Sequence, residues 1–418
     1  ITAIRGFNDI LPEDSPLLRH IEDAACRVFS SYGFSEIKVP VVEKTELFAR
    51  SIGQTTDIVE KEMYTFSDRH GESLTLRPEG TAPVVRAYIE HKMYVNPAVR
   101  LFYTGPMFRY ERPQKGRYRQ FYQIGAEVLG DDSPRVDAEV IGMLLKLFND
   151  LDVKGVELQI NSLGCPDCRP AYKEKLLNFL HGVKGALCEN CVRRIDENPL
   201  RALDCKSPKC IEATRNAPSI IDCLCTGCKS HFEEAGKFLA LDKIKPAINP
   251  RMVRGLDYYT RTAFEITALT ELGSQNAVAA GGRYDSLVEE LGGPKTPCFG
   301  FAIGVERVAL LIKHASAGLK KPLTVFISLG GEAEGKKMEL VKGLRDKGVS
   351  LIEDFSTGSL KSRMKRADRS GARFAAILGT DELKEGVVTL KDMKTSAQEK
   401  VPWGELADRL KSQSGGES

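Results

Sequence analysis

The sequence predicts an α+β protein with more than one domain. Three observations support this: the length of 418 residues, a strand–loop–strand segment at 100–130, and an alternation of strands and helices after Pro322. A chain of this length is typical of two or three domains, and a hydrophobic content of 42% is enough for real cores. The net charge of +3 is too weak to attract nucleic acid by itself, so any RNA contact must use local basic patches.

Several functional classes are not supported by the sequence. No apolar run approaches the length that crosses a bilayer, and no secretory signal is recognisable, so we expect no membrane partner and a cytoplasmic location. Neither G-x-G-x-x-G nor G-x-x-x-x-G-K-[ST] occurs. A Rossmann or P-loop nucleotide site is therefore not expected.

A helix and an interrupted strand are expected near the N-terminus. Ser15 and Pro16 combine a capping side chain with a first-turn proline, and apolar residues at helical spacing continue to Gly33. The following stretch, 33–48, is expected to be a strand broken by Pro40, which is typical of an edge strand.

A candidate ligand-binding turn lies in TLRPEGTAPVVRAYIEH, residues 75–91. Pro78 ends a strand, and Thr81 is an N-cap candidate for the helix that follows. Glu79 is open to two interpretations. It is either an acid in a solvated turn or a carboxylate held at a strand end to face the ammonium group of a ligand.

The longest recognisable motif is a β-hairpin at residues 100–130, RLFYTGPMFRYERPQKGRYRQFYQIGAEVLG. Its two arms, 102–111 and 121–128, are rich in aromatic residues, and the turn between them contains proline and glycine. The loop itself, 112–119, is basic and can bind phosphate groups.

The two arms of this hairpin carry polar side chains on defined faces. Because side chains alternate along a strand, Phe121, Gln123 and Glu127 share one face of the return arm. Arg109 and Glu111 share a face of the outgoing arm. The alternative is a half-exposed hairpin whose polar faces meet water, which is common in antiparallel sheets.

Cysteine is concentrated in one part of the chain, because nine of the eleven residues lie between Cys165 and Cys228. In a sequence without secretory features, such clustering favours metal or reduced thiols over disulfides. Cys165-x2-Cys168 and Cys188-x2-Cys191 together have the spacing of a four-thiolate zinc site. The alternative is a set of packed, free thiols. A rival or second site is open to the other cysteines, which are Cys205, Cys210, Cys223, Cys225 and Cys228.

Two further stretches place tyrosines beside charged residues. RGLDYYTRTAFEIT, which starts at Arg254, is expected to be a loop leading into a strand. AAGGRYDSLVEELGG, residues 279–293, is expected to be a glycine turn leading into a helix. A pair such as Tyr258-Tyr259 is usually core packing, because aromatic rings are often buried.

The C-terminal third contains a strand–helix junction and then a basic helix. CFGFAIGVERVALLI, residues 298–312, places Arg307 at the start of a helix, where it needs a partner if it is covered. The alternating elements after Pro322 predict a small α/β domain. Six basic residues lie between Lys361 and Arg373, and they form either a solvated helix face or a phosphate contact.

These motifs resemble the class II aminoacyl-tRNA synthetases. The hairpin string GPMFRYERPQKGRYRQFYQIGAEVLG resembles motif 2, GFAIGVER resembles motif 3, and residues 33–48 resemble motif 1. RPEGT, RGLDYY and AGGRYD resemble segments of the histidyl-tRNA synthetase family in particular. The resemblance implies an antiparallel sheet flanked by helices, an inserted helical domain and a C-terminal α/β anticodon-binding domain.

The resemblance also implies how the chain is divided and what it binds. Residues 1–162 and 246–320 would form the catalytic core, 163–245 an insertion over the tRNA acceptor stem, and 321–418 the anticodon-binding domain. The implied partners are L-histidine, ATP with Mg²⁺, histidine tRNA and a second copy of the chain, with motif 1 at the dimer interface. Zinc is not a general requirement of the family, so zinc in the insertion remains an open alternative.

The implied site residues divide into two sets around one reaction centre. Arg109 and Arg254 are the expected catalytic residues, because negative charge concentrates on the α-phosphate under attack. Glu127 and Tyr259 are expected to bind one imidazole nitrogen each. The histidine-binding set is Glu79, Gly80, Thr81, Arg109, Gln123, Glu127, Arg254, Tyr258, Tyr259 and Tyr284, and the ATP-binding set is Arg109, Glu111, Phe121 and Arg307.

The implied activity is two-step histidyl transfer. Histidine and ATP would give histidyl-adenylate and pyrophosphate, and the histidyl group would pass to the 3′ end of histidine tRNA. One alternative is a non-catalytic, synthetase-like regulatory subunit of the first histidine-biosynthesis enzyme. The basic loop, RGLDYY and the C-terminal domain argue against it. Another is a class IIa synthetase for threonine or proline, which Glu127, RGLDYY and AGGRYD disfavour.

Overall fold

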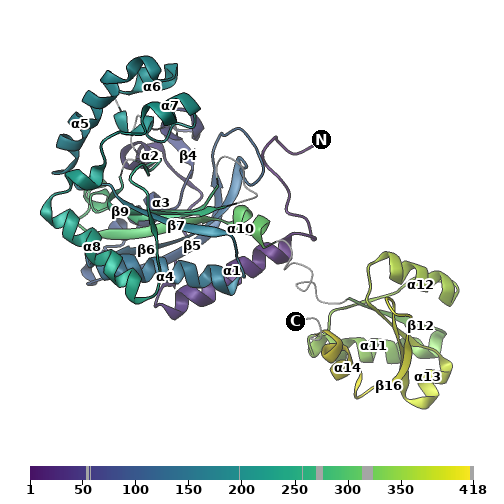
Figure 1. Cartoon of the computed structure of the whole chain (residues 1–418). Coiled ribbons are helices and arrows are strands. Elements are labelled where there is room, and N and C mark those ends of the chain that lie inside the picture. The colour runs from purple at the N-terminus through teal and green to yellow at the C-terminus, as the bar shows by residue number, and fades with distance from the viewer. Residues whose placement is uncertain are drawn as a thin grey trace. The chain divides into compact units, whose positions relative to one another are not determined.

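The computed structural model describes residues 1–52, 56, 58–196, 198–256, 258–269, 276–312 and 323–414. The chain divides into two units, Ile1–Lys313 and His314–Ser418, each with a hydrophobic core of its own (Figure 1). The boundary expected between residues 320 and 321 lies outside the described residues. In the part of the chain that is described, no helix combines the length and the apolar character needed to cross a bilayer.

An eight-stranded sheet forms the centre of the first unit, in the order β1-β5-β6-β11-β10-β9-β7-β8. Its inner neighbours pair antiparallel, and the two short edge strands β1 and β8 pair in parallel with β5 and β7. The predicted sheet is therefore confirmed. Its strands are β1 (Ser35–Glu36), β5 (Val99–Phe108), β6 (Gln120–Leu129), β7 (Val156–Ser162), β8 (Ala247–Ile248), β9 (Thr260–Ala268), β10 (Ala277–Arg283) and β11 (Cys298–Gly304).

Strands β5 and β6 form the predicted hairpin at the middle of this sheet. Their register places Tyr103 opposite Gly125 and Gly105 opposite Gln123. Strand β5 ends at Phe108, so Arg109 and Glu111 belong to the loop and not to the outgoing strand as predicted. The alternative of a water-facing return strand is wrong at Glu127, whose exposed fraction is 0%.

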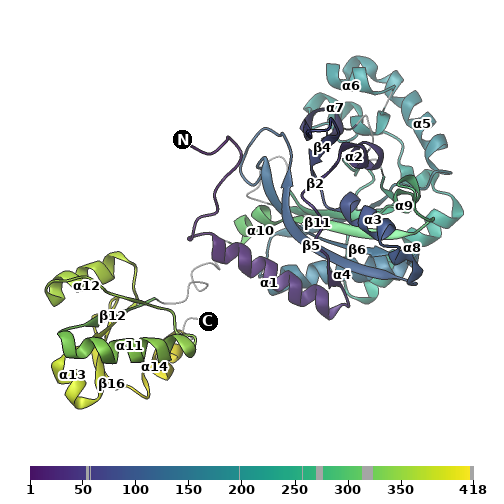
Figure 2. The same ribbon diagram turned by 180° about the vertical axis from the view of Figure 1, so that it is seen from behind.

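Helices cover both faces of the sheet. Helices α1, α4 and α8 lie along one face, and α5, α6 and α7 lie on the opposite side (Figures 1 and 2). The predicted helix after Ser15 is confirmed as α1, which buries apolar residues at helical spacing. The helices of this unit are α1 (Ser15–Ser31), α2 (Thr45–Ile52), α3 (Thr81–Glu90), α4 (Pro134–Asp150), α5 (Arg169–Gly182), α6 (Glu189–Arg194), α7 (Pro208–Ala213), α8 (Thr226–Leu241), α9 (Leu287–Glu290) and α10 (Val305–Leu311).

Two local predictions are wrong. The strand expected over 33–48 stops at Lys44, because Leu47 and Phe48 pack at helical spacing in α2 and not on a sheet. The glycine turn expected at AGGRYD is part of strand β10. A Cβ atom at Gly281 would lie 2.2 Å from the carbonyl oxygen of Gly300, so this glycine permits close strand pairing. A small second sheet joins β2 (Val42–Lys44), β4 (Ser73–Leu76) and β3 (Tyr64–Ser67).

The second unit is an α/β domain with a five-stranded sheet in the order β13-β12-β14-β15-β16. Strand β12 pairs in parallel with β13 and β14, and the other pairs are antiparallel. The predicted alternation is confirmed from β12 to β15, whereas α13, β16 and α14 were not predicted. The elements are β12 (Thr324–Ser328), α11 (Gly331–Asp346), β13 (Leu351–Glu353), α12 (Leu360–Arg369), β14 (Phe374–Leu378), α13 (Thr380–Glu385), β15 (Val387–Asp392), β16 (Gln398–Pro402) and α14 (Leu406–Ser414).

Candidate active site

A cavity of about 660 Å³ lies at the hairpin and gathers most of the predicted site residues. Its walls come from the hairpin, from β9, β10 and the start of α10, and from the loop that precedes β9. Leu203 and Lys206 of the cysteine-rich segment also line it. The predicted residues on the walls are Glu79, Thr81, Arg109, Glu111, Phe121, Gln123, Arg254, Tyr258, Tyr259 and Arg307. Gly80 adjoins Thr81, and Glu127 and Tyr284 lie against these walls through hydrogen bonds and ring contacts.

Glu127 is a fully buried carboxylate without a basic partner among the described residues. Its Oε1 accepts a hydrogen bond from the Thr81 hydroxyl at 2.7 Å, and its Oε2 accepts one from the Tyr284 hydroxyl at 2.5 Å. Burial raises the pKa of Glu127 to about 8, although both hydroxyl groups act in the opposite direction. A buried carboxylate of this kind is prepared for a ligand that donates a proton or carries positive charge.

Three tyrosines pack around this carboxylate. The ring centroids of Tyr258 and Tyr259 lie 4.8 Å apart, and those of Tyr258 and Tyr284 lie 5.7 Å apart. Burial raises the pKa of all three phenols, so they remain neutral hydrogen-bond donors and acceptors. Tyr258 and Tyr259 belong to the hydrophobic core and also line the cavity. Core packing and a place in the site are therefore both correct for this pair.

The turn before α3 does not act as predicted. Gly80, and not Thr81, is the N-cap residue of α3. The Thr81 hydroxyl instead donates to Glu127. Glu79 caps the helix with both oxygens, because Oε2 accepts from the Thr81 N–H at 2.7 Å and Oε1 from the Ala82 N–H at 2.8 Å. Burial raises the pKa of Glu79, and these two N–H groups lower it. Glu79 is thus a buried capping carboxylate that lines the cavity, and the solvated-turn interpretation is wrong.

Five arginines line the same cavity. Three of them, Arg109, Arg254 and Arg307, are predicted site residues, and each uses part of its guanidinium group in bonds within the protein. Arg109 donates from Nε to the Pro78 carbonyl at 2.8 Å. Arg254 forms an ion pair with Glu265, and Arg307 donates to the carbonyls of Gly116 and Ala277. Burial lowers the pKa of Arg109 and of Arg307. Their remaining donors give the cavity a cationic side suited to phosphate oxygens.

The Phe121 ring lies on this cationic side of the cavity. The Arg109 guanidinium carbon lies 5.4 Å from the ring centroid, so Arg109 faces this ring. Glu111 lies beside them, is 8% exposed, and forms ion pairs with Arg117 and Arg109. A flat aromatic ligand could stack in this part of the cavity, between an aromatic ring and guanidinium groups.

Three buried polar atoms near the cavity have no hydrogen-bond partner in the described part of the chain. They are Oε1 of Gln123, Nε of Arg254 and the hydroxyl of Tyr103. Gln123 and Arg254 line the cavity, and Tyr103 packs beneath Gly80 and Gly125, where a Cβ atom would lie 2.1 to 2.3 Å from its ring. Because buried polar groups are normally paired, these atoms are candidates for hydrogen bonds to a ligand.

Sequence reasoning missed four residues of this site. Tyr103 is detectable only through the hairpin register that places it opposite Gly125. The strand alternation in RTAFEIT could have placed Glu265 on the polar face of its strand. Its ion pair with Arg254 could not be predicted in this way. Arg117 was included in the basic loop without a role. Glu306 accepts a hydrogen bond from the Tyr122 N–H at 2.9 Å, and burial raises its pKa to about 7.

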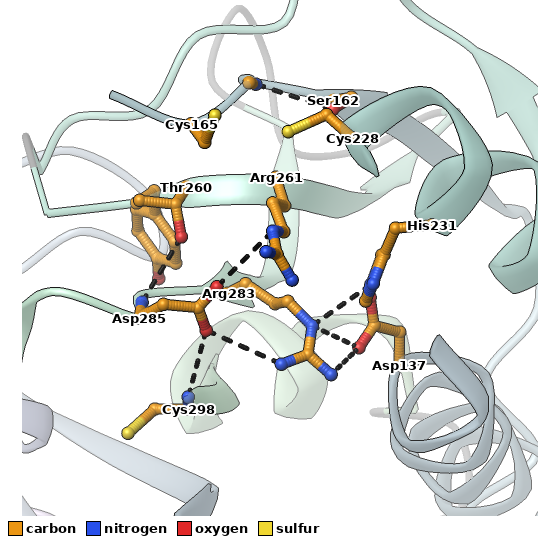
Figure 3. Close-up of polar contacts among 12 residues, drawn as sticks. Asp137, Ser162, Cys165, Cys228, His231, Thr260, Arg261, Arg283, Asp285 and Cys298 are labelled. Atoms are coloured by element: carbon orange, nitrogen blue, oxygen red, sulfur yellow. Dashed lines mark hydrogen bonds and ion pairs between the residues drawn. The ribbon is translucent and has the colours of Figure 1, made fainter. Parts of the chain in front are cut away.

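A second buried charge cluster lies outside the cavity. Arg283 donates from Nε to Asp137 at 2.8 Å, and His231 shares a hydrogen bond with the other Asp137 oxygen at 2.8 Å (Figure 3). Arg283 also forms a longer ion pair with Asp285, whose second carboxylate oxygen lies 3.7 Å from Arg261. The Arg and Asp of AGGRYD are therefore engaged inside the protein, and only its Tyr284 contacts Glu127.

The cysteines do not pair as their spacing suggested. Cys165 and Cys168 lie with Cys225 and Cys228, and not with the pair at 188 and 191. Cys188 and Cys191 form a separate cluster with Cys205 and Cys210. The predicted grouping of these two pairs was wrong, because sequence spacing does not show which loop ends the helices bring together, whereas the second site left open for the other cysteines agrees with these clusters. Cys223 belongs to neither cluster and lies 3.7 Å from the ammonium group of Lys175.

Known proteins resemble this chain over nearly its whole length. A family model described as histidyl-tRNA synthetase matches residues 6–308, and one described as an anticodon binding domain matches residues 324–413. The chain is 56% identical to a histidine–tRNA ligase of Geobacter sulfurreducens, with 96% of this chain and 97% of that protein covered. It is 50% identical to a histidine–tRNA ligase of Aquifex aeolicus, with 97% and 100% covered. The solved apo structure of S. aureus histidyl-tRNA synthetase matches with a TM-score of 0.80 at 37% identity, over 98% of this chain and 100% of that chain.

Proposed function

The chain belongs to the histidyl-tRNA synthetase family and is an ATP-dependent ligase that joins histidine to tRNA, and from this premise we propose how its cavity performs the reaction. Histidine and ATP form histidyl-adenylate with release of pyrophosphate, and the histidyl group then passes to the 3′ end of the tRNA. The observation that carries our assignment is the buried Glu127 with its two hydroxyl partners, beside a cavity that Arg109, Arg254 and Arg307 line.

We propose that the imidazole ring of histidine lies against Glu127 and Tyr259. One ring N–H would donate to Glu127, and the other nitrogen would pair with the Tyr259 phenol. The ammonium group would meet the unpaired Oε1 of Gln123, with Glu79 as a nearby negative charge. An amino acid without ring nitrogens would leave these buried groups unpaired, which is the basis of strong discrimination.

ATP occupies the cationic end in this proposal. Arg109 and Arg254 would contact the α-phosphate, where negative charge develops as the histidine carboxylate attacks. The adenine would stack on Phe121, with Arg307 on its other side and Glu111 near its amino group. When bound, Mg²⁺ would neutralise phosphate charge, and Glu265 offers a cavity-lining carboxylate oxygen of the kind that Mg²⁺ accepts.

Contacts with tRNA and with a second subunit are proposed for segments outside the cavity. The anticodon-binding domain contacts tRNA, and we propose that residues 163–245 lean over the acceptor stem. We further propose a homodimer, located in the cytoplasm, with the motif 1 segment 33–48 at its interface. Val42 and Phe66 expose apolar side chains on the small sheet next to that segment, with exposed fractions of 38% and 46%.

Other functions are less well supported. The regulatory-subunit alternative is not favoured, because the relatives at 50% to 56% identity are histidine–tRNA ligases that this chain covers almost fully. The cavity is also lined by Arg109, Arg254 and Arg307, whose guanidinium groups can bind phosphate oxygens.

The test is ATP–pyrophosphate exchange with each amino acid in turn. We expect exchange with histidine only, and exchange of similar rate with threonine or proline would overturn the assignment. Arg254→Ala separates binding from chemistry. We expect the rate constant of adenylate formation at saturating histidine to fall about 100-fold, because a preorganised donor to the reacting phosphate is lost. If only the KM for histidine changes, Arg254 is a binding residue and not a catalytic one.

A further inference from the structure

We propose that the cysteine-rich segment binds two zinc ions, one in each of two four-cysteine clusters. Cluster 1 consists of Cys165, Cys168, Cys225 and Cys228. Cluster 2 consists of Cys188, Cys191, Cys205 and Cys210. Within each cluster the four sulfur atoms lie no more than 4.8 Å from one another. Four convergent thiols without another ligand type are the donor set of a closed, structural zinc site.

The sulfur–sulfur distances fit a zinc tetrahedron. A tetrahedron with Zn–S bonds of about 2.3 Å has sulfur–sulfur edges of about 3.8 Å. In cluster 1 the sulfur of Cys165 lies 3.5 Å from that of Cys168 and 3.9 Å from that of Cys225. In cluster 2 the sulfurs of Cys188 and Cys205 lie 3.8 Å apart.

Other groups that thiols form have different geometry. A disulfide requires a sulfur–sulfur distance of about 2.05 Å, well below these values. A four-iron cluster binds each thiolate to a different iron, which holds the four sulfurs farther apart than a single ion does. The compact sets seen here therefore favour one small tetrahedral ion in each cluster.

Backbone N–H groups support the same interpretation in both clusters. The N–H of Cys225 donates to the sulfur of Cys168 at 3.1 Å, and the N–H of Cys188 donates to the sulfur of Cys210 at 3.1 Å. Each bond crosses from one half of its cluster to the other. Such donors stabilise the negative charge of metal-bound thiolates and orient them. The same arrangement at two separate places is unlike chance packing of free thiols.

The two clusters would connect separate helices of the cysteine-rich segment. Cys168 and Cys225 are the N-cap residues of α5 and α8, so cluster 1 ties together the starts of the two longest helices of the segment. Cluster 2 joins the start of α6 to Cys210 in α7. The segment has an apolar core of its own, to which Cys191 and Cys210 belong, and metal cross-links are a common way to stabilise small modules.

These cross-links also reach the wall of the active-site cavity. Arg169 follows Cys168 directly and donates to the carbonyls of Leu163 and Tyr259. Cys205 of cluster 2 lines the cavity itself. Zinc would therefore hold the segment against the loop that carries Arg254 and Tyr259, and its loss would loosen that wall.

The test is elemental analysis of the purified full-length protein and of cysteine variants. We expect two zinc ions per chain in the wild type. Cys165→Ser/Cys168→Ser and Cys188→Ser/Cys191→Ser should each lose one ion, and the combined variant should lose both. Pairing by sequence spacing would instead make the two double variants lose the same single ion. Cys223→Ser, outside both clusters, is the matched control and should keep two.

A second measurement does not depend on whether the variants fold. Titration of the wild-type thiols with a mercurial reagent should release two zinc ions, in two steps of four thiols each. Release of a single ion, an absence of zinc in active protein, or iron in its place would overturn the proposal. The metal count is independent of histidine activation, so this test and that of the reaction can fail separately.

Discussion

Two buried carboxylates in the first unit, Glu127 and Asp137, have opposite surroundings. Both have an exposed fraction of 0%. Asp137 forms an ion pair with Arg283 and shares a hydrogen bond with His231, each at 2.8 Å. Among the described residues Glu127 has only two hydroxyl partners, and burial raises its pKa to about 8. One carboxylate is complete within the protein, whereas the other is left for something outside the chain to complete.

The difference shows how to separate structural from functional charge in this fold. A compensated ion cluster such as Asp137–Arg283–His231 connects α4, β10 and α8 and leaves no capacity for a ligand. A buried carboxylate without a charged partner lowers the stability of the fold. Such groups are found at functional sites, where a ligand supplies the missing charge or hydrogen-bond donor. Glu127 lies in a segment that resembles a family motif, and Asp137 contacts Arg283 of another such segment. Membership of a motif therefore does not separate the functional carboxylate from the structural one.

The largest effect is expected from Glu127→Gln. The amide keeps the size of the side chain. It has only one acceptor oxygen and no negative charge, so it cannot replace the carboxylate. We expect kcat/KM for histidine in ATP–pyrophosphate exchange to fall about 1,000-fold, as is typical when one partner of a buried charged pair is removed. Glu289→Gln, on an exposed position of α9, is the control and should leave exchange unchanged. If ATP–pyrophosphate exchange by Glu127→Gln stays within a few-fold of the wild-type rate, the functional role given to Glu127 is wrong.

Asp137→Ala should have the reverse outcome. It leaves Arg283 buried without its nearest carboxylate, which typically costs about 3 to 5 kcal/mol in the free energy of unfolding. We expect a much lower midpoint in urea unfolding, while KM for histidine at low temperature stays near the wild-type value. Asp150→Ala, at the exposed end of the same helix, removes only a surface ion pair with Lys146 and should cost less than about 0.5 kcal/mol.

The pH dependence of stability sharpens the same contrast. In the folded protein Glu127 holds its proton up to about pH 8, whereas a glutamate in the unfolded chain loses it near the ordinary value of 4.5. Between these values the folded state binds more protons than the unfolded state, so this group makes stability fall as pH rises. Each pKa unit corresponds to about 1.4 kcal/mol.

This predicts a pH-dependent gain for Glu127→Gln. Thermal unfolding should show little difference from wild type near pH 4.5, where Glu127 is neutral in the folded state. At pH 8.5 the variant should be more stable by several kcal/mol, because it has no carboxylate to ionise in the buried position. A difference that is the same at both pH values would show that Glu127 is compensated by a group not identified here.

Much of the fold and site follows from the sequence because local rules act within short segments. Strand alternation placed Gln123 and Glu127 on one face of β6, and the first-turn proline located the start of α1, although its N-cap is Asp14 and not Ser15. Long-range pairing did not follow. Neither the partnership of Cys165 with Cys225 nor that of Asp137 with Arg283 leaves a signal in local sequence, because each depends on how distant helices and strands pack.

Glycine was the other source of error, since it has two opposite uses. At Gly281 and Gly300 it allows strands to approach closely, and at Gly300 a Cβ atom would lie 1.7 Å from Oε2 of Glu127. The sequence Gly-Gly before Arg283 indicated a turn equally well. Only the strand register distinguishes a glycine that makes room for a buried carboxylate from one that reverses the chain.

The smallest effect is expected from Thr81→Val, which removes one of the two hydroxyl groups that hold Glu127. Valine has nearly the same shape, so the fold should persist, but the ionised form of Glu127 loses a donor and its pKa should rise further. A hydrogen bond to a charged group contributes about 1.5 to 3 kcal/mol, so kcat/KM for histidine should fall at least about 10-fold. Thr81→Ser restores the donor and should restore most of the activity. If Thr81→Val has no effect while Glu127→Gln is severely impaired, the Tyr284 hydroxyl alone holds the carboxylate in position.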